Sequence, residues 1–238
     1  LSHRRVATRA MNHLKSDIGD RWKLPAAGAE LYSLDEVKEF AKTHGEVVLK
    51  APWSSSGRGV YWTKEIMTPS MQGWIKRVIE KQGSIMGEVA MKRVQDFAME
   101  FRVVDHKTEF VGYSLFFTEG TGAYRGNVLM SNERIEEELS RWIEKEQLDA
   151  VRKNLISFID SVVAPIYSGC MGVDMFVYED EDGFCLDPVV EINMRMTMGM
   201  VARVIYDKYV SKDSEGSFVV EHKLPGRLFV NHQWHESH

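Results

Sequence analysis

The most informative stretch of the sequence covers residues 171–195 and reads MGVDMFVYEDEDGFCLDPVVEINMR. Two apolar runs, 171–178 and 184–192, flank the acidic run at 179–183. Apolar runs of this length around a polar break that ends in Gly predict two antiparallel strands joined by a hairpin turn. The acidic run lacks the spacing of an EF-hand, so we interpret it as a solvated turn and not as a calcium loop.

Polar side chains interrupt these apolar strands at a few positions. Successive residues of a strand point to opposite faces, so Glu191, Asn193 and Arg195 should share one face. Asp174 lies on the preceding strand and can reach the same face. Two carboxylates and an amide oxygen are hard ligands that suit Mg²⁺ bound to phosphates. The alternative is an ion pair from Arg195 to Glu191 or Asp174, and this segment alone does not decide between the two.

A lysine and a Ser/Gly-rich loop follow a short apolar strand. Residues 46–50 read EVVLK, and the loop APWSSSGRG at 51–59 separates them from a second strand, VYWT, at 60–63. The ammonium of Lys50 and the free backbone N–H groups of the loop are donors that can hold a polyphosphate. The pattern is not a Walker loop, and a Ser/Gly loop between strands is more often an ordinary turn, so both interpretations stay open.

Helix signals occur in four places. Residues 2–15 form the first predicted helix, and a capping box of Ser33 and Glu36 begins a second one that extends to about residue 44. A Thr-Pro pair at 68–69 begins a third helix, with Pro in its first turn. Apolar residues at helical spacing between 132 and 166 predict a long helical region that packs into the core.

The central part of the sequence is strand-like. Apolar runs at 88–94, 99–104 and 109–117 are separated by short polar breaks at 95–96 and 105–107. This pattern predicts an antiparallel meander. The first run passes into a polar loop, so it could form an edge on which a flat base stacks and hydrogen-bonds, although taken alone it is an ordinary strand.

The overall composition excludes several classes of protein. The 238 residues are 44% hydrophobic and 27% charged, which excludes a disordered chain. A net charge of −5 argues against a general nucleic-acid binder. No apolar run approaches the ~18 residues needed to cross a bilayer, so we expect a soluble protein without a membrane contact. Cys170 and Cys185 lie in apolar stretches, and we interpret them as reduced, buried thiols of a cytoplasmic protein.

In this order and spacing, the three polar segments resemble the ATP-grasp superfamily, and most of all its glutathione-synthetase and glutamate-ligase branch. In that family a V-x-K strand precedes a Gly-rich loop that closes over the phosphates. A hinge strand then reads adenine with its backbone, and a distal acid followed by E-x-N holds two magnesium ions. The combination of G-V-D at 172–174 with V-E-I-N at 190–193 is fairly specific, and the resemblance covers nearly the whole chain.

The resemblance implies a role for each matching residue of this chain. The implied ATP-binding residues are the phosphate lysine, the loop, the hinge and the ribose-binding acid that follows it: Lys50, Ser54, Ser55, Ser56, Gly57, Arg58, Gly59, Lys92, Arg93, Val94, and Asp96 or Glu100. The implied ligands of magnesium or manganese are Asp174, Glu191 and Asn193. Catalytic stabilisation of the transferred phosphoryl group is implied for Arg195, and for Arg125 within the stretch YRGN.

The resemblance also implies an architecture. It is an α+β fold of the ATP-grasp type, in which two α+β subdomains hold ATP between antiparallel sheets. We expect one ATP-grasp domain over residues 1–238, with a small lid subdomain at about 45–95. The larger, metal-binding subdomain is expected at about 96–238, with residues 1–44 packed on it. We also expect the chain to lack the small domain that precedes the ATP-grasp region in most relatives.

The implied activity is ATP- and Mg-dependent ligation, in which a carboxylate is activated as an acyl phosphate for attack by an amine or similar nucleophile. A phosphotransferase of the same superfamily and a nucleotide-binding module without turnover remain as alternatives. The expected partners are small-molecule carboxylate and amine substrates, without nucleic acid or membrane, and a homodimer is compatible with the resemblance. The sequence names neither substrate.

Overall fold

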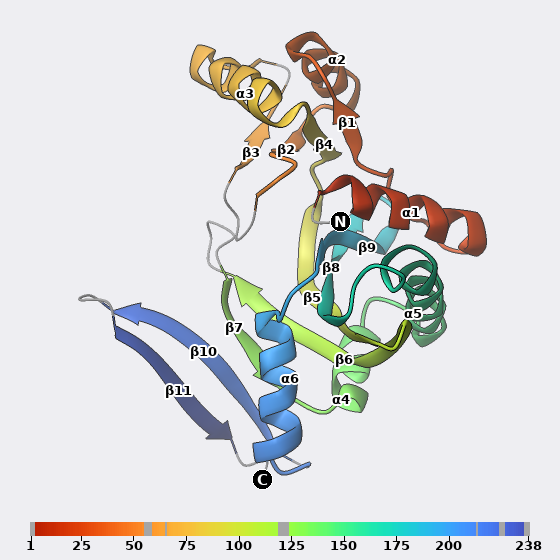
Figure 1. Ribbon diagram of the computed structural model, residues 1–238, viewed down its shortest axis with the longest axis vertical. Helices are drawn as coiled ribbons and strands as arrows, with labels where there is room; N and C mark the ends of the chain where they lie inside the picture. The colour runs from red at the N-terminus through yellow and green to blue at the C-terminus, as the bar shows by residue number, and fades with distance from the viewer. Residues whose placement is uncertain are drawn as a thin grey trace.

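The computed structural model describes residues 3–54, 59–64, 66–118, 124–212, 214–223 and 227–235. Two antiparallel sheets, each covered by helices, make up this part of the chain. Figure 1 shows the smaller sheet with α2 and α3 above the larger sheet with α1, α5 and α6. Within the described ranges, no helix is both long enough and apolar enough to cross a membrane.

The smaller unit is built on a four-stranded sheet with the strand order β1-β4-β2-β3. Its elements are β1 (Ala29–Leu31), α2 (Leu34–His44), β2 (Val47–Lys50), β3 (Val60–Thr63), α3 (Pro69–Gln82) and β4 (Ile85–Val89). Both helices pack on one face of this sheet, where Val37, Leu49 and Ile75 belong to a core of its own. The opposite face is left open toward the larger unit.

Local signals in the sequence begin both helices of the smaller unit. The side chain of Ser33 accepts a hydrogen bond from the backbone N–H of Glu36 at 3.1 Å, and the Glu36 carboxylate accepts one from Tyr32 N at 2.9 Å. This pair resembles a capping box, although the carboxylate accepts from the residue before the N-cap and not from the N-cap itself. Thr68 caps α3 by accepting a hydrogen bond from Met71 N at 3.3 Å. The predicted starts of α2 and α3 are confirmed.

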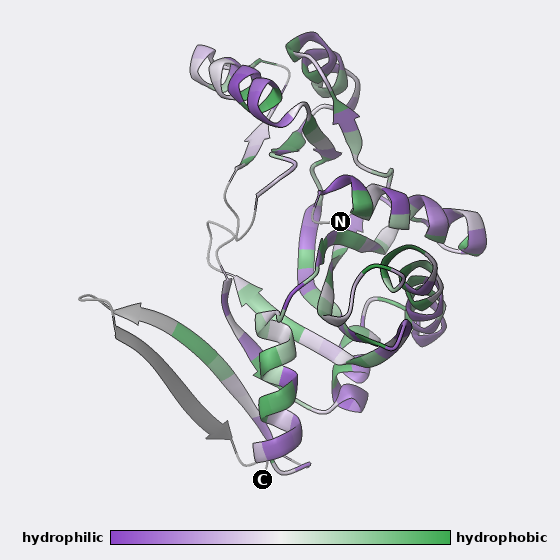
Figure 2. Ribbon diagram, viewed as in Figure 1, coloured by the Kyte–Doolittle hydropathy of each residue, from purple (hydrophilic) through white to green (hydrophobic). Residues whose placement is uncertain are grey.

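The larger unit is built on a seven-stranded antiparallel sheet with the order β11-β10-β7-β6-β5-β8-β9. Its elements are α1 (Arg5–Ile18), β5 (Lys92–Val104), β6 (Lys107–Thr118), β7 (Tyr124–Leu129), α4 (Asn132–Leu139), α5 (Lys145–Phe158), the π-helical turn η1 (Ile159–Val163), β8 (Gly169–Asp180), β9 (Gly183–Asn193), α6 (Met198–Tyr209), β10 (Glu215–Lys223) and β11 (Arg227–His235). Helices α1, α4 and α5 cover one face, and α6 lies against the other, beside β6 and β7. In Figure 2, α1 and α5 carry both hydrophobic and hydrophilic residues, as expected of helices that bury one side.

Side-chain alternation along the central strands separates the core from a polar face. Phe97, Met99 and Phe101 of β5 are fully buried in the core under α1 and α5. Glu100, between two of them, points to the other face of the sheet, as does Asp174 of the neighbouring strand β8. The polar side chains of the sheet centre therefore share the face that looks toward α6 and the smaller unit.

The segment that connects the two units differs from the predicted meander. A strand at 88–94 and a turn at 95–96 were expected, but β4 ends at Val89, and β5 passes through 95–96 without interruption. The pairing of β5 with β8 shifts register between Arg93 and Gln95. The polar residues therefore produce a β-bulge, which bends a strand while keeping it paired, and not a turn.

Two predicted hairpins are confirmed. Asp105 and His106 both adopt positive φ values, 49° and 60°, in the two-residue turn between β5 and β6. This backbone conformation is typical of a type I′ hairpin turn. The acidic run forms the turn between β8 and β9, where Gly183 has a φ of 124°. Cys170 and Cys185 are free thiols; Cys185 is buried, as predicted, whereas Cys170 is half-buried.

Two boundaries differ from the predicted ones. Residues 1–44 were expected to pack on the larger subdomain, but only α1 does so. Strand β1 pairs with β4 and α2 packs on the smaller sheet, so the smaller unit begins at Ala29. The helical region predicted over 132–166 is divided at 140–144 into α4 and α5 and ends in η1. The start of the smaller unit at Ala29 is decided by pairing between strands that are far apart in the sequence, and local patterns contain no information about such pairing.

Candidate active site

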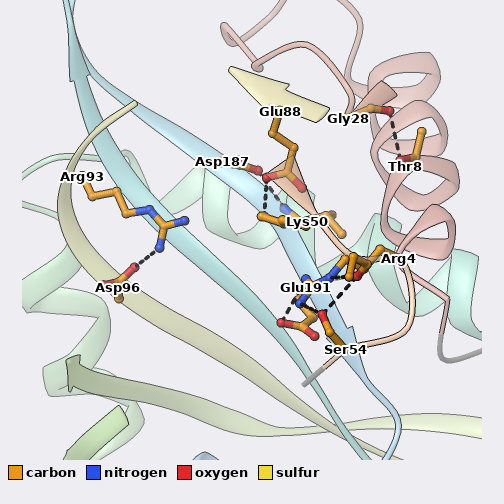
Figure 3. Close-up of polar contacts among 12 residues, drawn as sticks. Arg4, Thr8, Gly28, Lys50, Ser54, Glu88, Arg93, Asp96, Asp187 and Glu191 are labelled. Carbon is orange, nitrogen blue, oxygen red and sulfur yellow. Dashed lines mark hydrogen bonds and ion pairs between the residues drawn. The ribbon is translucent and has the colours of Figure 1, made fainter. Parts of the chain in front are cut away.

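A cleft lies between the open face of the smaller sheet and the larger unit. Three parts of the chain line it: the start of α1 with Arg4, Thr8 and Met11; the smaller sheet with Val48, Trp62 and Glu88; and the larger sheet with Arg93, Phe176, Asp187 and Val189. Figure 3 shows how the polar members of this set converge from all three parts. Flat apolar rings on two different sheets and charged groups at both ends make this cleft the candidate site.

Lys50 lies at the end of β2, on the same side of the strand as Val48, which lines the cleft. It is 4% exposed, and its ammonium forms an ion pair with the carboxylate of Glu88 on the adjacent strand β4. Alternation along β2 directs Lys50 and Val48 toward the cleft and Leu49 into the core. A buried ammonium requires an acceptor, which Glu88 supplies. The structure thus places the predicted phosphate lysine beside a carboxylate of the cleft lining that the sequence analysis did not single out.

Asp187 enters the same end of the cleft, and sequence reasoning missed it. Its side chain is 8% exposed, and Oδ1 accepts a hydrogen bond from Val189 N at 3.2 Å. Burial, reinforced by the negative charge of Glu88, raises the pKa of Asp187 to about 6, although the charges of Lys50 and Arg93 oppose the shift. The one available signal was a carboxylate within an otherwise apolar strand.

The residues predicted to bind metal lie together on the polar face of β8 and β9. Asp174 and Glu191 are directly paired across the two strands. Asn193 Nδ2 donates a hydrogen bond to Asp174 Oδ2 at 3.0 Å, and Arg195 Nη2 donates one to Asn193 Oδ1 at 3.0 Å. The ion pair from Arg195 to a carboxylate, which was the alternative interpretation, is not among the interactions of the described residues.

The electrostatics of this group favour a cation. Burial raises the pKa of Asp174 to about 8, and the negative charges of Glu191 and Glu100 reinforce the shift. Among the described residues, no three His, Cys, Asp or Glu side chains are close enough to hold a metal ion by themselves. Two carboxylates and the amide oxygen of Asn193 nevertheless match the hard donors that Mg²⁺ prefers, and phosphate oxygens normally complete its shell.

Arg4 is a second residue that the sequence analysis missed. It is 8% exposed, and its Nη1 lies 3.3 Å from Glu191 Oε2. Its Nε donates a hydrogen bond to Ala51 O at 3.3 Å, and Nη2 donates one to Ser54 Oγ at 3.4 Å. One guanidinium therefore joins the start of α1, the loop after β2 and the strand that carries the predicted metal ligands (Figure 3). No motif marks Arg4 in the sequence, because its partners are 47 or more residues away.

Glu100, one of two candidates for a ribose-binding acid, lies deep in the larger unit. It is 1% exposed, and its two oxygens accept hydrogen bonds from Ser114 Oγ at 3.0 Å and Thr197 Oγ1 at 2.7 Å. Thr197 also caps α6 by accepting a hydrogen bond from Met200 N at 2.9 Å. Burial raises the pKa of Glu100 to about 7, while the two hydroxyl groups oppose the shift. Glu100 thus connects β5, β6 and the start of α6.

Two glycines make room for the Glu100 carboxylate. A Cβ atom on Gly199 would lie 2.0 Å from Glu100 Oε1 and 2.3 Å from Ser114 Oγ. A Cβ atom on Gly172 would lie 2.8 Å from Glu100 Oε2. The close approach of α6 to the sheet therefore requires glycine at both positions.

The other candidate for the ribose-binding acid, Asp96, lies near the cleft beside Arg93. Arg93 Nη1 donates a hydrogen bond to Asp96 Oδ1 at 3.3 Å, and the guanidinium lies 4.2 Å from the centre of the Phe176 ring. Burial raises the pKa of Asp96, and Arg93 opposes the shift. Lys92 and Val94 do not line the cleft, and Lys92 pairs with a carboxylate of β8. Of these three predicted hinge residues, Arg93 is the one that lines the cleft.

The predicted phosphate loop is described at its two ends. Ser54 Oγ donates a hydrogen bond to Ala51 O at 3.0 Å. Gly59 has a φ of 65°, and a Cβ atom there would lie 3.0 Å from the Ala51 side chain, so this end of the loop is tight. Ser55, Ser56, Gly57 and Arg58 lie outside the described residues, and their predicted contacts with phosphate stay predictions.

The stretch YRGN contributes a buried amide. Asn127 is fully buried in β7, where its Nδ2 donates a hydrogen bond to Leu115 O at 3.2 Å and its Oδ1 accepts one from the Tyr124 hydroxyl. Arg125, between them, is exposed. Its predicted catalytic role stays a prediction.

Known structures share this architecture. The biotin carboxylase domain dimer of the Hydrogenobacter thermophilus 2-oxoglutarate carboxylase, in complex with MgADP, ADP and bicarbonate, is 13% identical, with a TM-score of 0.62 over 94% of this chain and 51% of that one. N5-carboxyaminoimidazole synthetase from Staphylococcus aureus, complexed with ADP, is 11% identical, with a TM-score of 0.58 over 93% of this chain and 57% of that one. D-alanyl-alanine synthetase A from Vibrio cholerae is 14% identical, with a TM-score of 0.54 over 84% of this chain and 61% of that one.

The comparisons define the fold. This chain spans about half to three fifths of the length of those three structures. Neither a family model nor a curated protein sequence matches it. The solved structures are ATP-grasp enzymes, and their match extends over both sheets, so the fold predicted from the sequence is confirmed. The chain has the ATP-grasp fold.

Proposed function

We propose that this protein is an ATP- and Mg-dependent ligase, which activates a carboxylate as an acyl phosphate for attack by an amine or similar nucleophile. One observation carries the proposal. Two residues of the cleft lining, Glu88 and Arg4, connect the cleft to the predicted site residues: Glu88 pairs with Lys50 of the smaller sheet, and Arg4 pairs with Glu191 of the larger sheet, which lies beside Asp174. The MgADP, ADP and bicarbonate bound to the carboxylase domain of the same fold support this reading.

The base of the nucleotide is assigned to the end of the cleft between the two sheets. Trp62 of β3 and Phe176 of β8 are the aromatic members of the cleft lining and come from different sheets. Rings on opposite walls favour a flat heterocycle, since stacking is effective over a whole ring face. Glu88 lies beside them and supplies an acceptor for a base amine.

The phosphates are assigned to the end where Arg4 and Glu191 meet. Arg4 offers a delocalised cation whose planar fork matches phosphate oxygens. Lys50 approaches from the base end, where it pairs with Glu88, and its ammonium is the proposed contact of the α- and β-phosphates. Asp174, Glu191 and Asn193 would hold magnesium, which when bound neutralises charge on the β- and γ-phosphates. Arg195 lies next to this group through Asn193 and is the proposed contact of the transferred phosphoryl group.

The proposed reaction has two steps. A substrate carboxylate oxygen forms a bond to the γ-phosphorus of ATP as the bond to the β–γ bridging oxygen breaks, which gives an acyl phosphate and ADP. The amine then attacks the acyl carbon, loses a proton and expels inorganic phosphate. The residues of this chain align the groups and neutralise spreading negative charge, which is the main requirement of phosphoryl transfer.

The proposal is tested by measuring phosphate release that depends on Mg-ATP. The candidate substrates are a panel of amino acids and small carboxylates, each tried with and without an amine. Hydroxylamine added in place of the amine should trap the acyl phosphate as a hydroxamate. A phosphorylated product without free phosphate would instead identify a phosphotransferase. Nucleotide binding without any turnover would identify a binding module.

Nucleotide binding is tested separately by thermal unfolding. Mg-ATP at ~100 times its dissociation constant should raise the free energy of unfolding by about 2.7 kcal/mol. For a chain of this length, that corresponds to an increase in Tm of roughly 5–11 °C. No shift at millimolar Mg-ATP would overturn the proposal. The homodimer stays a prediction, which sedimentation with and without Mg-ATP tests.

A further inference from the structure

The base end of the cleft contains two carboxylates, one from each sheet. Glu88 comes from β4 of the smaller sheet and Asp187 from β9 of the larger sheet, and both line the cleft (Figure 3). They are close enough that the charge of Glu88 acts on Asp187. An ordinary base pocket is mainly apolar with a few polar groups, so a second carboxylate calls for a function.

Asp187 has an oxygen without a partner among the described residues. Its Oδ1 accepts a hydrogen bond from Val189 N at 3.2 Å, and no donor is recorded for Oδ2 in that part of the chain. The Asp187 side chain is only 8% exposed, and it lines the cleft. Oδ2 does not belong to the fully buried polar atoms of the described residues that lack a partner, so it is open to the cleft, where a ligand that brings a donor can reach it.

The cations around Asp187 are each engaged elsewhere. The ammonium of Lys50 pairs with Glu88. Arg93 lies over the Phe176 ring and donates to Asp96. The third nearby cation, Arg4 before α1, pairs with Glu191. None of the three lies within ion-pair distance of Asp187 in the described structure, so the open oxygen is not explained by an internal salt bridge.

The register of the β8–β9 hairpin aims Asp187 at the cleft. Asp174 pairs with Glu191 and Phe176 pairs with Asp187, so one residue of β8 lies opposite three residues of β9, 188–190. The extra residues include Pro188, which lacks a backbone donor and is tolerated at a bulge. The bulge places Asp187 opposite Phe176, in the wall of the base pocket.

We propose that Asp187 and Glu88 together bind the two hydrogens of an exocyclic base amine, so that Asp187 is a specificity-determining residue for the nucleotide. The inference rests on the proposed function and deepens it. A 6-aminopurine offers one hydrogen to each carboxylate. A 6-oxopurine would place its carbonyl oxygen against two carboxylates, and the repulsion would select against it.

The test compares dissociation constants for Mg complexes of ATP, ITP and N6-methyl-ATP, measured by calorimetry on the wild type, Asp187→Leu and Asp187→Asn. The wild type should bind ATP at least ~10-fold more tightly than N6-methyl-ATP, because methylation removes one of the two hydrogens. Asp187→Leu should reduce that ratio to about 2 or less, mainly by weakening ATP. Asp187→Asn keeps the side-chain size and can donate from its amide, so it should shift preference toward ITP.

Asp182→Asn is the matched control, since it makes the same carboxylate-to-amide change at the exposed tip of the same hairpin. It should leave every ratio unchanged. An unchanged ratio of ATP to N6-methyl-ATP in both Asp187 variants would overturn the specificity role while leaving nucleotide binding intact. Absence of any nucleotide binding to the wild type would instead overturn the proposed function, and the specificity role with it.

Discussion

The guanidinium of Arg4 lies 3.3 Å from the carboxylate of Glu191, although 187 positions separate the two residues. The same guanidinium also reaches Ala51 O and Ser54 Oγ in the loop after β2. A cation from the start of the chain therefore occupies the point where the smaller sheet and the predicted metal ligands meet. This placement yields the first prediction.

Replacement of Arg4 by alanine should weaken binding of Mg-ATP much more than binding of AMP, because the guanidinium is assigned to the phosphates and not to the base. A loss of at least ~10-fold in ATP affinity, about 1.4 kcal/mol, is expected. Calorimetric titration with ATP, ADP and AMP measures it. Arg5→Ala is the control, since Arg5 is adjacent and exposed. Equal losses for ATP and AMP would contradict the assignment.

Lys50→Ala should weaken ATP binding by at least ~10-fold and also destabilise the fold, because Glu88 loses its ion-pair partner in a partly buried position. The double variant Lys50→Met with Glu88→Gln separates the two effects. It removes both charges, so it should recover most of the lost stability without recovering ATP affinity. Chemical denaturation and nucleotide titration of the two variants check this, and an unchanged affinity in Lys50→Ala would count against the role of the lysine.

Glu191→Gln should abolish Mg-dependent phosphoryl transfer and leave the fold intact, because the amide keeps the size of the carboxylate but not its charge. Phosphate release over a magnesium titration measures the loss, and circular dichroism measures the fold. Glu179→Gln, on the same hairpin at an exposed position, is the control and should keep full activity. Activity near the wild-type rate in Glu191→Gln would show that the metal assignment is wrong.

Three carboxyl groups with raised pKa values should make the ligand-free protein less stable as the pH rises. The pKa values of Asp174, Glu100 and Asp187 are raised to about 8, about 7 and about 6. The unfolded chain releases these protons near pH 4, so the folded state holds more protons between about pH 4 and pH 8. The free energy of unfolding therefore falls through that window.

Asp174→Asn should remove the largest part of this pH dependence. At pH 8 the variant should be more stable than the wild type by roughly 1–3 kcal/mol, and near pH 4 the two should be similar. Thermal unfolding without nucleotide, followed from pH 4 to pH 8.5, measures the difference. The same decline of Tm with pH in both proteins would show that Asp174 is not the group responsible.

Gly199→Ala should destabilise the protein by roughly 2–4 kcal/mol, since the new Cβ atom would lie 2.0 Å from a buried carboxylate oxygen of Glu100. Gly73→Ala in α3 is the control. Its Cβ atom meets only the end of the flexible Arg77 side chain, at 3.4 Å. Helix propensity then favours alanine by up to about 1 kcal/mol. Denaturant midpoints of the two variants should move in opposite directions.

Local signals predicted much of the fold correctly. The capping box of Ser33 and Glu36, the Thr-Pro start of α3 and the β8–β9 hairpin depend on residues only a few positions apart. The same kind of reasoning failed at 95–96, where polar residues suggested a turn and the structure has a bulge. Polarity alone does not distinguish the two, because both expose backbone and side chains to water.

The residues of the candidate site also fall into two groups, those that the sequence identified and those that it missed. Asp174, Glu191 and Asn193 were identified because strand alternation places them on one face, and the structure brings them together. Arg4 was missed because its partners are distant in sequence, and Asp187 because a single carboxylate in an apolar strand matches no motif. Glu100 was identified as an acidic residue of the site, but its burial and its two hydroxyl partners could not be foreseen.

By itself, the sequence determined the helix starts, the hairpins and the shared face of Asp174, Glu191 and Asn193, because hydrogen-bonded caps, turn geometry and side-chain alternation act over a few residues. Only the tertiary structure decided that β1 and α2 belong to the smaller unit, that Glu88 and Asp187 meet at one end of the cleft, and that Arg4 reaches Glu191. Those outcomes depend on strand pairing and on desolvated charges finding partners across the whole chain, and no local pattern encodes either.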